Sequence, residues 1–137
     1  MTQDEKFILL QDLCTRIPYG VKFMLNKNIY TAKGIDLIVT DEGDWEYAVT
    51  AKGIKPIEIG YIKPYLRPIS SITLEELRKY KCFRDHIRDS ECKIHIVNYA
   101  QIDWFIANHF DYRGLIPMGI ALPATEGMYN LIEKIIL

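Results

Sequence analysis

Residues 109–119, HFDYRGLIPMG, hold the densest group of chemically active side chains in the sequence. His109 with Asp103 or Asp111 could carry acid–base chemistry, because an imidazole titrates near neutral pH and a carboxylate can orient its proton. The motifs of nucleophile elbows, P-loops, zinc proteases and dinucleotide-binding enzymes are absent from the chain. We therefore leave the question of an enzyme open and lean toward a non-catalytic protein.

The same stretch is also typical of a tight turn after a helix. Asp111 can accept hydrogen bonds from nearby backbone amides, and Gly114 permits a left-handed backbone. Phe110 and Leu115 would then enter the core, while Arg113 would pair with Asp111 or with another nearby aspartate, Asp103. We favour this turn over a direct functional role.

A second cluster has residue types that bind metals. Its four members are Cys82, His86, Cys92 and His95, in the spacing C-x3-H-x5-C-x2-H. A tetrahedral zinc site uses such thiolates and imidazoles, but this spacing is not that of a standard zinc finger. A chain of this size with an apolar core does not need a metal to fold, so we expect neither metal nor cofactor.

Charge is distributed unevenly along a chain whose net charge is −1. Residues 34–51 hold five carboxylates and no Lys or Arg, whereas residues 52–88 hold nine basic residues against four acidic ones. Solvated faces of a strand pair and a helix explain this contrast, which could also steer a charged partner. A nucleic-acid-associated module would use the basic segment, with tyrosines stacking on single strands. The residues that we expect at a binding surface are Tyr65, Arg67, Tyr80, Arg84, His109, Asp111, Tyr112 and Arg113.

The first element that positions these side chains is a helix over residues 1–17. Thr2 and Glu5 have the spacing of a capping box. Apolar residues then recur every three or four positions, which is typical of an amphipathic helix. The residues that this spacing turns inward are Phe7, Leu10, Leu13, Cys14 and Ile17.

Residues 20–66 change to a period of two, which predicts an antiparallel meander. We expect short strands at about 21–25, 29–31, 35–39, 45–49 and 57–61, with Gly43 in a hairpin loop. The meander should curl into a small barrel-like sheet. Residues 63–68, KPYLRP, form a stiff connector rather than a central strand, because two prolines remove hydrogen-bond donors.

Residues 73–137 form a mostly helical part. Thr73 and Glu76 form a second capping box, which predicts a helix over about 74–87. Asn98 caps another helix through about residue 108, and 93–97 is a possible strand. The apolar tail from 127 to 137 is expected to dock on the core, as helix or strand.

The whole pattern predicts one α+β domain over residues 1–137, a common domain size. Three cysteines without paired spacing fit reduced thiols. The first residues do not form a secretory signal, and no apolar run approaches the length of a membrane helix. We expect a cytoplasmic protein that does not contact membranes.

Four segments carry a resemblance to a known group of proteins. They are IPYGV at 17–21, KPYLRPISSIT at 63–73, FDYRGLI at 110–116 and EGMYN at 126–130. Together they resemble short uncharacterised proteins of Bacteroidetes phages, prophages and mobile elements. The resemblance implies an accessory protein in a bacterial cytoplasm, and it assigns no substrate or cofactor.

The function that we expect is non-catalytic binding of a host or element-encoded protein. A catalytic constellation is missing, while the chain is rich in tyrosine and polarised in charge. The alternatives are a nucleic-acid-associated module that uses residues 52–88, and a small enzyme that uses His109 and Asp111.

Overall fold

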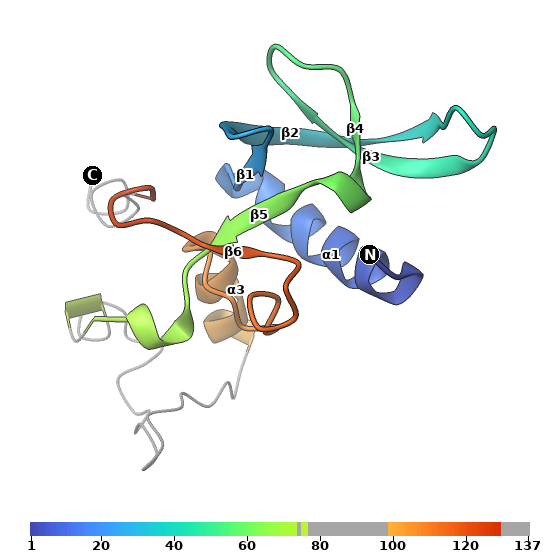
Figure 1. The fold of residues 1–137 in the computed structure, drawn as a ribbon. Helices are drawn as coiled ribbons and strands as arrows, with labels where there is room; N and C mark the ends of the chain where they lie inside the picture. The colour runs from blue at the N-terminus through green and yellow to red at the C-terminus, as the bar shows by residue number, and fades with distance from the viewer. Residues whose placement is uncertain (74, 77–98, 130–137) are drawn as a thin grey trace.

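The computed structural model describes residues 1–73, 75–76 and 99–129 (Figure 1). The described helices are α1 (Gln3–Arg16) and α3 (Tyr99–Ala107). Three short 3-10 helices are η1 (Ile17–Tyr19), η2 (Ile59–Tyr61) and η3 (Ile69–Ser71). Its strands are β1 (Lys22–Leu25), β2 (Asn28–Val39), β3 (Trp45–Ala51), β4 (Ile57–Glu58), β5 (Lys63–Leu66) and β6 (Leu122–Pro123). The predicted α+β class is confirmed. No helix of the described residues is long and apolar enough to cross a bilayer.

The predicted capping box at the start of α1 is confirmed. The Glu5 amide donates to Thr2 Oγ1 at 3.1 Å, and the Thr2 amide donates to the Glu5 carboxylate at 2.9 Å. Both bonds satisfy amides that have no partner within the helix. The two bonds also hold the pKa of Glu5 below its usual value, the backbone bond contributing most.

The buried side of α1 differs from the prediction. Phe7 is 60 % exposed and Cys14 is also exposed, although spacing placed both inward. The residues of α1 that are buried are Leu9, Asp12, Leu13 and Arg16. The apolar period failed here because two charged residues, which bond to each other, share the buried face.

The meander begins with a tight hairpin. Leu25 pairs with Asn28, so β1 and β2 are joined by two residues, Asn26 and Lys27. Both have positive φ, at 49° and 66°, as the commonest two-residue hairpin turn requires. The strands predicted at 29–31 and 35–39 are one long strand, β2, interrupted by a register shift between Ala32 and Gly34.

The sheet is curled but open. Its order is β4-β3-β2-β1-β5-β6, so β4 and β5 are four strand spacings apart, about 19 Å in a flat sheet. Only Ile59–Ile62 joins them, and three of these residues form η2, whose rise is about 2 Å per residue. The sheet must therefore bend. No described pairing joins its edges β4 and β6, so the predicted barrel is not supported.

Strand β5 corrects the prediction for the connector. Lys63–Leu66 lies inside the sheet, between β1 and β6, despite Pro64. The pairings are staggered: β1 pairs with Lys63 and Pro64, whereas β6 pairs in parallel with Tyr65 and Leu66. The ladder with β6 starts one residue after the proline, so it needs no donor from Pro64.

The later part of the chain is described only in part. The Thr73 capping box is confirmed, because the Glu76 amide donates to Thr73 Oγ1 at 3.1 Å and the Thr73 amide donates to Glu76 Oε1 at 3.2 Å. Glu75 and Glu76 are helical, and the rest of the helix predicted over 74–87 lies outside the described residues. The same holds for the possible strand at 93–97 and for residues 130–137 of the tail. The helix predicted after Asn98 and through about residue 108 is confirmed as α3.

Two apolar clusters hold the described fold together. The larger packs α1 against the curled sheet, with Leu13, Phe23, Val49 and Ile62 fully buried. The smaller contains Trp104, Phe105 and Phe110, whose rings lie 5.2 to 5.9 Å apart. Such aromatic contacts add to the gain from burying apolar area.

Candidate functional site

The outer half of the β2–β3 hairpin extends beyond the rest of the sheet (Figure 1). Strand β1 pairs with β2 only as far as Thr31, and β4 pairs with β3 only at Ala48 and Val49. Residues 36–39 and 45–47, with the loop between them, therefore form a two-stranded ribbon whose outer edges have no described partner strand. We call this segment the ribbon.

One side of the ribbon is apolar and exposed. Leu37 is opposite Tyr47 and Val39 is opposite Trp45, so these four side chains lie on one face. Their exposed fractions are 54 %, 45 %, 55 % and 67 % in that order. The next pair inward puts the fully buried Val49 on the same face. This ribbon face therefore continues the core-facing side of the sheet into solvent.

Helix α1 forms a second wall beside the ribbon face. A cleft of about 210 Å³ lies between the N-terminal half of α1 and β3. Phe7 and Leu10 line it from the helix, and Trp45 and Tyr47 line it from the ribbon. The exposed Phe7 thus extends the apolar surface of the ribbon. Single exposed apolar side chains are common on proteins, whereas a contiguous apolar surface of this kind marks an interaction site.

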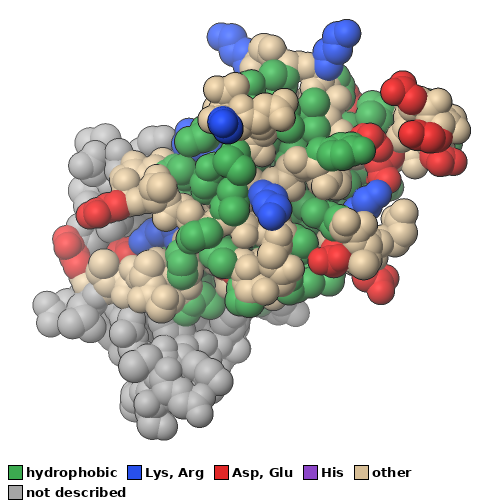
Figure 2. Space-filling model, in the orientation of Figure 1, with side chains coloured by type: hydrophobic (Ala, Val, Ile, Leu, Met, Phe, Trp, Pro, Cys, Tyr) green, Lys and Arg blue, Asp and Glu red, His purple; other side chains and the backbone are tan. Residues whose placement is uncertain are grey.

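The ribbon also carries unbalanced negative charge. Its exposed carboxylates are Asp36, Asp41, Glu42 and Asp44, and none forms an ion pair with a described residue. Glu46 is the exception, because Lys6 Nζ of α1 lies 3.0 Å from its Oε2. Figure 2 shows a group of acidic side chains at the tip of the hairpin.

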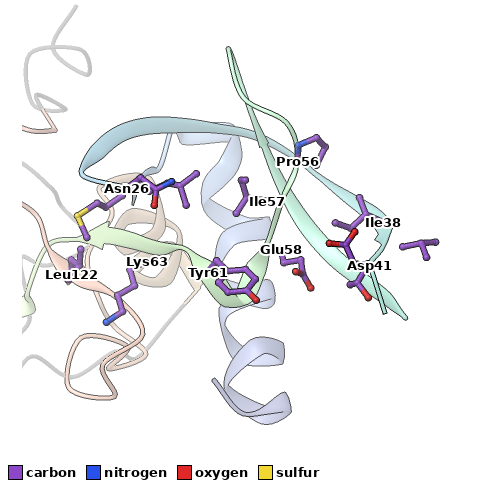
Figure 3. A pocket seen from close by; sticks show the side chains of 13 residues that line it. Asn26, Ile38, Asp41, Pro56, Ile57, Glu58, Tyr61, Lys63 and Leu122 are labelled. Carbon is purple, nitrogen blue, oxygen red and sulfur yellow. The ribbon is translucent and has the colours of Figure 1, made fainter. Parts of the chain in front are cut away.

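A groove of about 620 Å³ borders the ribbon (Figure 3). It lies between β2 and the segment of β4, η2 and β5. Asp41 and Glu58 lie at one end, and Lys63 and Leu122 lie at the other. Between them Tyr61 is 73 % exposed. The volume fits a bound side chain or a small ligand, and the two ends carry opposite charges.

The stretch that first suggested an active site forms a buried corner, residues 108–116, at the end of α3. The Phe110 amide donates to the Phe105 carbonyl at 2.9 Å, and the His109 amide donates to the Ile106 carbonyl at 3.1 Å. These two bonds close α3 in the way that is common when the residue after the C-cap is left-handed. His109 takes that conformation with φ 60°, although such a backbone costs a non-glycine residue about 1–2 kcal/mol.

His109 is fixed by one ring contact and one hydrogen bond, and its Nδ1 has no described hydrogen-bond partner. Its side chain is fully buried, its ring stacks on Tyr129 at 4.2 Å, and its Nε2 lies 2.9 Å from the Tyr19 carbonyl oxygen. Burial, together with the positive charges of Arg16, Arg67 and Lys22, outweighs the hydrogen bond to the Tyr19 carbonyl and lowers the pKa of His109 to about 4. The imidazole is therefore neutral near pH 7 and is sealed from substrate.

Tyr129 fastens the start of the tail to the sheet. Its hydroxyl donates to the Tyr65 carbonyl and accepts from the Lys22 amide, both at 2.8 Å. Burial raises the pKa of Tyr129 well above its usual value, so the hydroxyl keeps its proton. The part of the predicted docking tail that is described thus lies on the core.

Asp111 is fully occupied by the turn. The Leu115 amide donates to its Oδ1 at 2.7 Å, and the Ile116 amide donates to its Oδ2 at 2.9 Å. Gly114 has φ 79°, as the turn prediction required, and Phe110 and Leu115 are buried. The interpretation as a turn is confirmed. His109 and Asp111 bond to different parts of the backbone, so the structure gives no acid–base pair between them.

A buried ion pair under the corner was missed by the sequence analysis. Arg16 Nε lies 2.8 Å from Asp12 Oδ2, and both side chains are inaccessible to solvent. Arg16 Nη2 also donates to the Phe110 carbonyl at 2.6 Å. Arg113 Nε lies 3.3 Å from Asp12 Oδ1, so the predicted pairing of Arg113 with Asp103 or Asp111 is wrong. The spacing of residues 12 and 16 on one helix face was the only sign of this pair.

The structure brings Arg67 beside the corner, because the Arg67 amide donates to the His109 carbonyl at 2.7 Å and the Asp111 amide donates to the Arg67 carbonyl at 2.8 Å. The side chains of the remaining predicted binding residues that are described make contacts within the fold. Arg67 is paired with Glu76 at 2.7 Å and lies 4.1 Å above the Phe110 ring. Tyr112 stacks on Phe105 at 6.3 Å. Tyr65 is half-buried in β5. Tyr80 and Arg84 lie outside the described residues, as do the metal candidates Cys82, His86, Cys92 and His95. In the described ranges, no three His, Cys, Asp or Glu side chains are placed to hold a metal ion.

No family model, curated protein or solved structure matches the chain significantly. The resemblance to phage and mobile-element proteins therefore stays a prediction, and the candidate site rests on the geometry of this chain alone. The ribbon face and the groove are the surfaces whose side chains are accessible and uncommitted. The corner has more titratable side chains, but those of His109 and Asp111 form hydrogen bonds with the backbone.

Proposed function

We propose that this protein is a non-catalytic interaction protein that binds a partner protein through the ribbon face. The observation that carries the proposal is the row of exposed apolar pairs, Leu37 with Tyr47 and Val39 with Trp45. Aromatic side chains are enriched at protein interfaces, and contiguous exposed apolar patches mark interaction sites. Leaving this apolar face exposed to water does not stabilise the folded chain, whereas covering it with a partner would bury apolar surface.

The corner supports a role without catalysis. A general base must reach its substrate and titrate near the working pH. His109 is fully buried with a lowered pKa, and both oxygens of Asp111 accept backbone hydrogen bonds. These facts count against the small enzyme that the sequence left open.

The proposal includes a cellular setting, which the sequence resemblance supports. We infer an accessory protein of a Bacteroidetes phage, prophage or mobile element, acting in the bacterial cytoplasm. The partner is then a host or element-encoded protein. Accessory proteins of mobile elements commonly act by binding such factors, and the ribbon face offers the surface for it.

Photo-crosslinking in a Bacteroidetes cell tests the proposal. A benzophenone amino acid replaces Tyr47 on the ribbon face, and in a matched chain it replaces Ile29, which is 53 % exposed on the β1–β2 hairpin. We expect discrete protein adducts from position 47 and none from position 29. Adducts from position 29 alone, or none from either position, would refute binding through the ribbon face.

A nucleic-acid-associated module is the second candidate, favoured by one observation. Lys52 and Lys55 are exposed on the β3–β4 loop, and Lys63 shares the groove with the exposed Tyr61. Single strands bind where basic groups and aromatic rings alternate. Arg67, which the sequence assigned to this surface, is instead paired with Glu76.

A mobility-shift titration decides between the two candidates. We expect no retention of a single-stranded oligonucleotide at low salt, because the carboxylates of the groove oppose phosphate. Retention that falls steeply with salt, and that is lost in both Lys63→Ala and Tyr61→Ala, would replace the protein-binding proposal with this one.

A further inference from the structure

We propose that the partner segment on the ribbon face is a cationic amphipathic helix, with apolar side chains along one stripe and Lys or Arg at its flanks. This inference rests on the proposed function and names the chemistry of the partner. It follows from three properties of the ribbon: its apolar face, its charge and the wall that α1 provides.

The apolar face fits one stripe of a helix. Successive side chains on one face of a strand are about 7 Å apart, and opposite residues on paired strands are about 5 Å apart. The four side chains Leu37, Val39, Trp45 and Tyr47 thus cover a short strip. A helix presents its apolar positions i, i+3, i+4 and i+7 over about 10 Å, so two turns cover this strip.

Helix α1 lies beside this strip of apolar side chains, so the two together form a cleft that a partner can enter. The cleft of about 210 Å³ between α1 and β3 is lined by Phe7, Leu10, Trp45 and Tyr47. It can receive one large apolar side chain of the partner. Helices that bind proteins commonly lay their apolar face into a groove of this kind.

The negative charge of the ribbon favours a positively charged partner. Asp41, Glu42 and Asp44 lie at the loop end of the ribbon face, Asp36 lies on the opposite side of the ribbon, and the described residues offer none of them an ion-pair partner. Residues 34–51 contain no Lys or Arg. Complementary charge speeds association and disfavours partners of the same sign. A phosphate backbone has the wrong sign, and a second copy of the chain carries the same acidic residues on its ribbon, so neither has the complementary charge.

The test uses three synthetic helical peptides of about 18 residues, or five turns. All share one stripe of Leu, and their flanks are Lys, Gln or Glu. Their binding to the full chain is measured by fluorescence anisotropy of a label on the peptide. We expect the Lys peptide to bind at least about tenfold more tightly than the Gln peptide, and the Glu peptide not to bind.

Two pairs of variants locate the binding. Asp41→Lys with Glu42→Lys should weaken binding of the Lys peptide about tenfold, and the matched reversal Asp103→Lys with Glu126→Lys should change it less than about twofold. Trp45→Ser should remove binding, whereas Tyr61→Ser, which changes an exposed ring of the groove, should not. Circular dichroism of each variant shows whether it is folded.

The outcomes separate this inference from the proposed function. If the Gln peptide binds as tightly as the Lys peptide and Trp45→Ser still removes binding, the cationic partner is wrong and binding through the ribbon face stands. If Trp45→Ser leaves the binding of every peptide unchanged, the ribbon face itself is the wrong site. If sedimentation shows a dimer that Trp45→Ser dissolves, a second copy of the chain is the occupant and the cationic helix is overturned.

Discussion

The corner and the ribbon use their side chains in opposite ways. At the corner and in the part of α1 beneath it, the charged residues Asp12, Arg16 and Asp111 are buried, and each bonds within the fold. On the ribbon the apolar side chains are exposed, and its carboxylates other than Glu46 have no described ion-pair partner. Burial of a polar group is costly unless it is bonded, and exposure of a large apolar patch gains nothing for the monomer. This difference shows that the dense polar motif at the corner stabilises the fold, whereas the surface that is free to bind a partner is the apolar face of the ribbon.

If this contrast is correct, mutations at the corner reduce stability and mutations on the ribbon reduce binding. The largest effect is expected from Asp12→Ala, which leaves Arg16 buried without its 2.8 Å partner. Removing one member of a buried ion pair costs about 3–5 kcal/mol. Urea denaturation monitored by circular dichroism measures this loss of unfolding free energy.

The matched control is the ion pair between α1 and the ribbon. Lys6 and Glu46 are 3.0 Å apart but keep 23 % and 16 % of their side-chain surface exposed. Lys6→Ala should cost only about 0–1 kcal/mol, because such a pair is well solvated. Similar losses in Asp12→Ala and Lys6→Ala would remove the distinction between the two regions.

The second prediction concerns the pH dependence of the corner. The pKa of His109 is lowered from 6.5 to about 4 in the folded chain, mainly by burial. Between these two pH values the unfolded chain therefore binds a proton at His109 more readily than the folded chain does. The unfolding free energy is not reduced by this proton above about pH 6.5, and it falls as the pH is lowered toward 4. The loss is on the order of 3 kcal/mol.

Denaturation curves measured from pH 4 to pH 7.5 test this dependence. The comparison variant is His109→Asn, because asparagine tolerates the left-handed backbone at this position. The variant should lose less stability on acidification than the natural chain. An identical pH dependence in both chains would show that His109 does not carry the proton linkage.

The third prediction sharpens the role of Asp111. Asp111→Ala removes both acceptors of the Leu115 and Ile116 amides, which lie 2.7 and 2.9 Å away. We expect a loss of about 2 kcal/mol, since bonds to a charged group contribute about 1.5–3 kcal/mol each and water replaces part of them. Asp103→Ala, at an exposed position of α3, should change stability by less than about 0.5 kcal/mol. Equal effects would contradict the assignment of Asp111 to the turn.

Local rules predicted much of this architecture. The capping boxes at Thr2 and Thr73 and the turn at Asp111 depend on residues within five positions, so the sequence alone identified them. Pairings between distant residues were not accessible in this way. Parallel β6 on β5, and Arg16 Nη2 donating to the Phe110 carbonyl, join segments more than fifty residues apart. Their formation depends on the curl of the sheet, which periodicity does not encode.

The candidate site shows the same limit. A period of two placed Leu37, Val39, Trp45 and Tyr47 in strands, and register confirms that they share one face. Periodicity identifies an apolar face but cannot tell what covers it. The ribbon face became a candidate only when the pairings showed that β1 and β4 end before reaching it. At the corner the turn was predicted, but the burial of His109 and Asp111 was not, because burial cannot be read from residue types.

The last prediction concerns the ribbon, where Trp45→Ser should affect stability less than the substitutions of Asp12 and Asp111 do. Trp45 is 67 % exposed and its only described cross-strand neighbour, Val39, is 55 % exposed. Removing its ring should change the unfolding free energy by less than about 1 kcal/mol, as is usual for exposed positions. The same urea titration measures this value. A loss above about 2 kcal/mol would mean that the ring is packed within the folded chain, in which case the ribbon face is not a free surface and differs little from the corner.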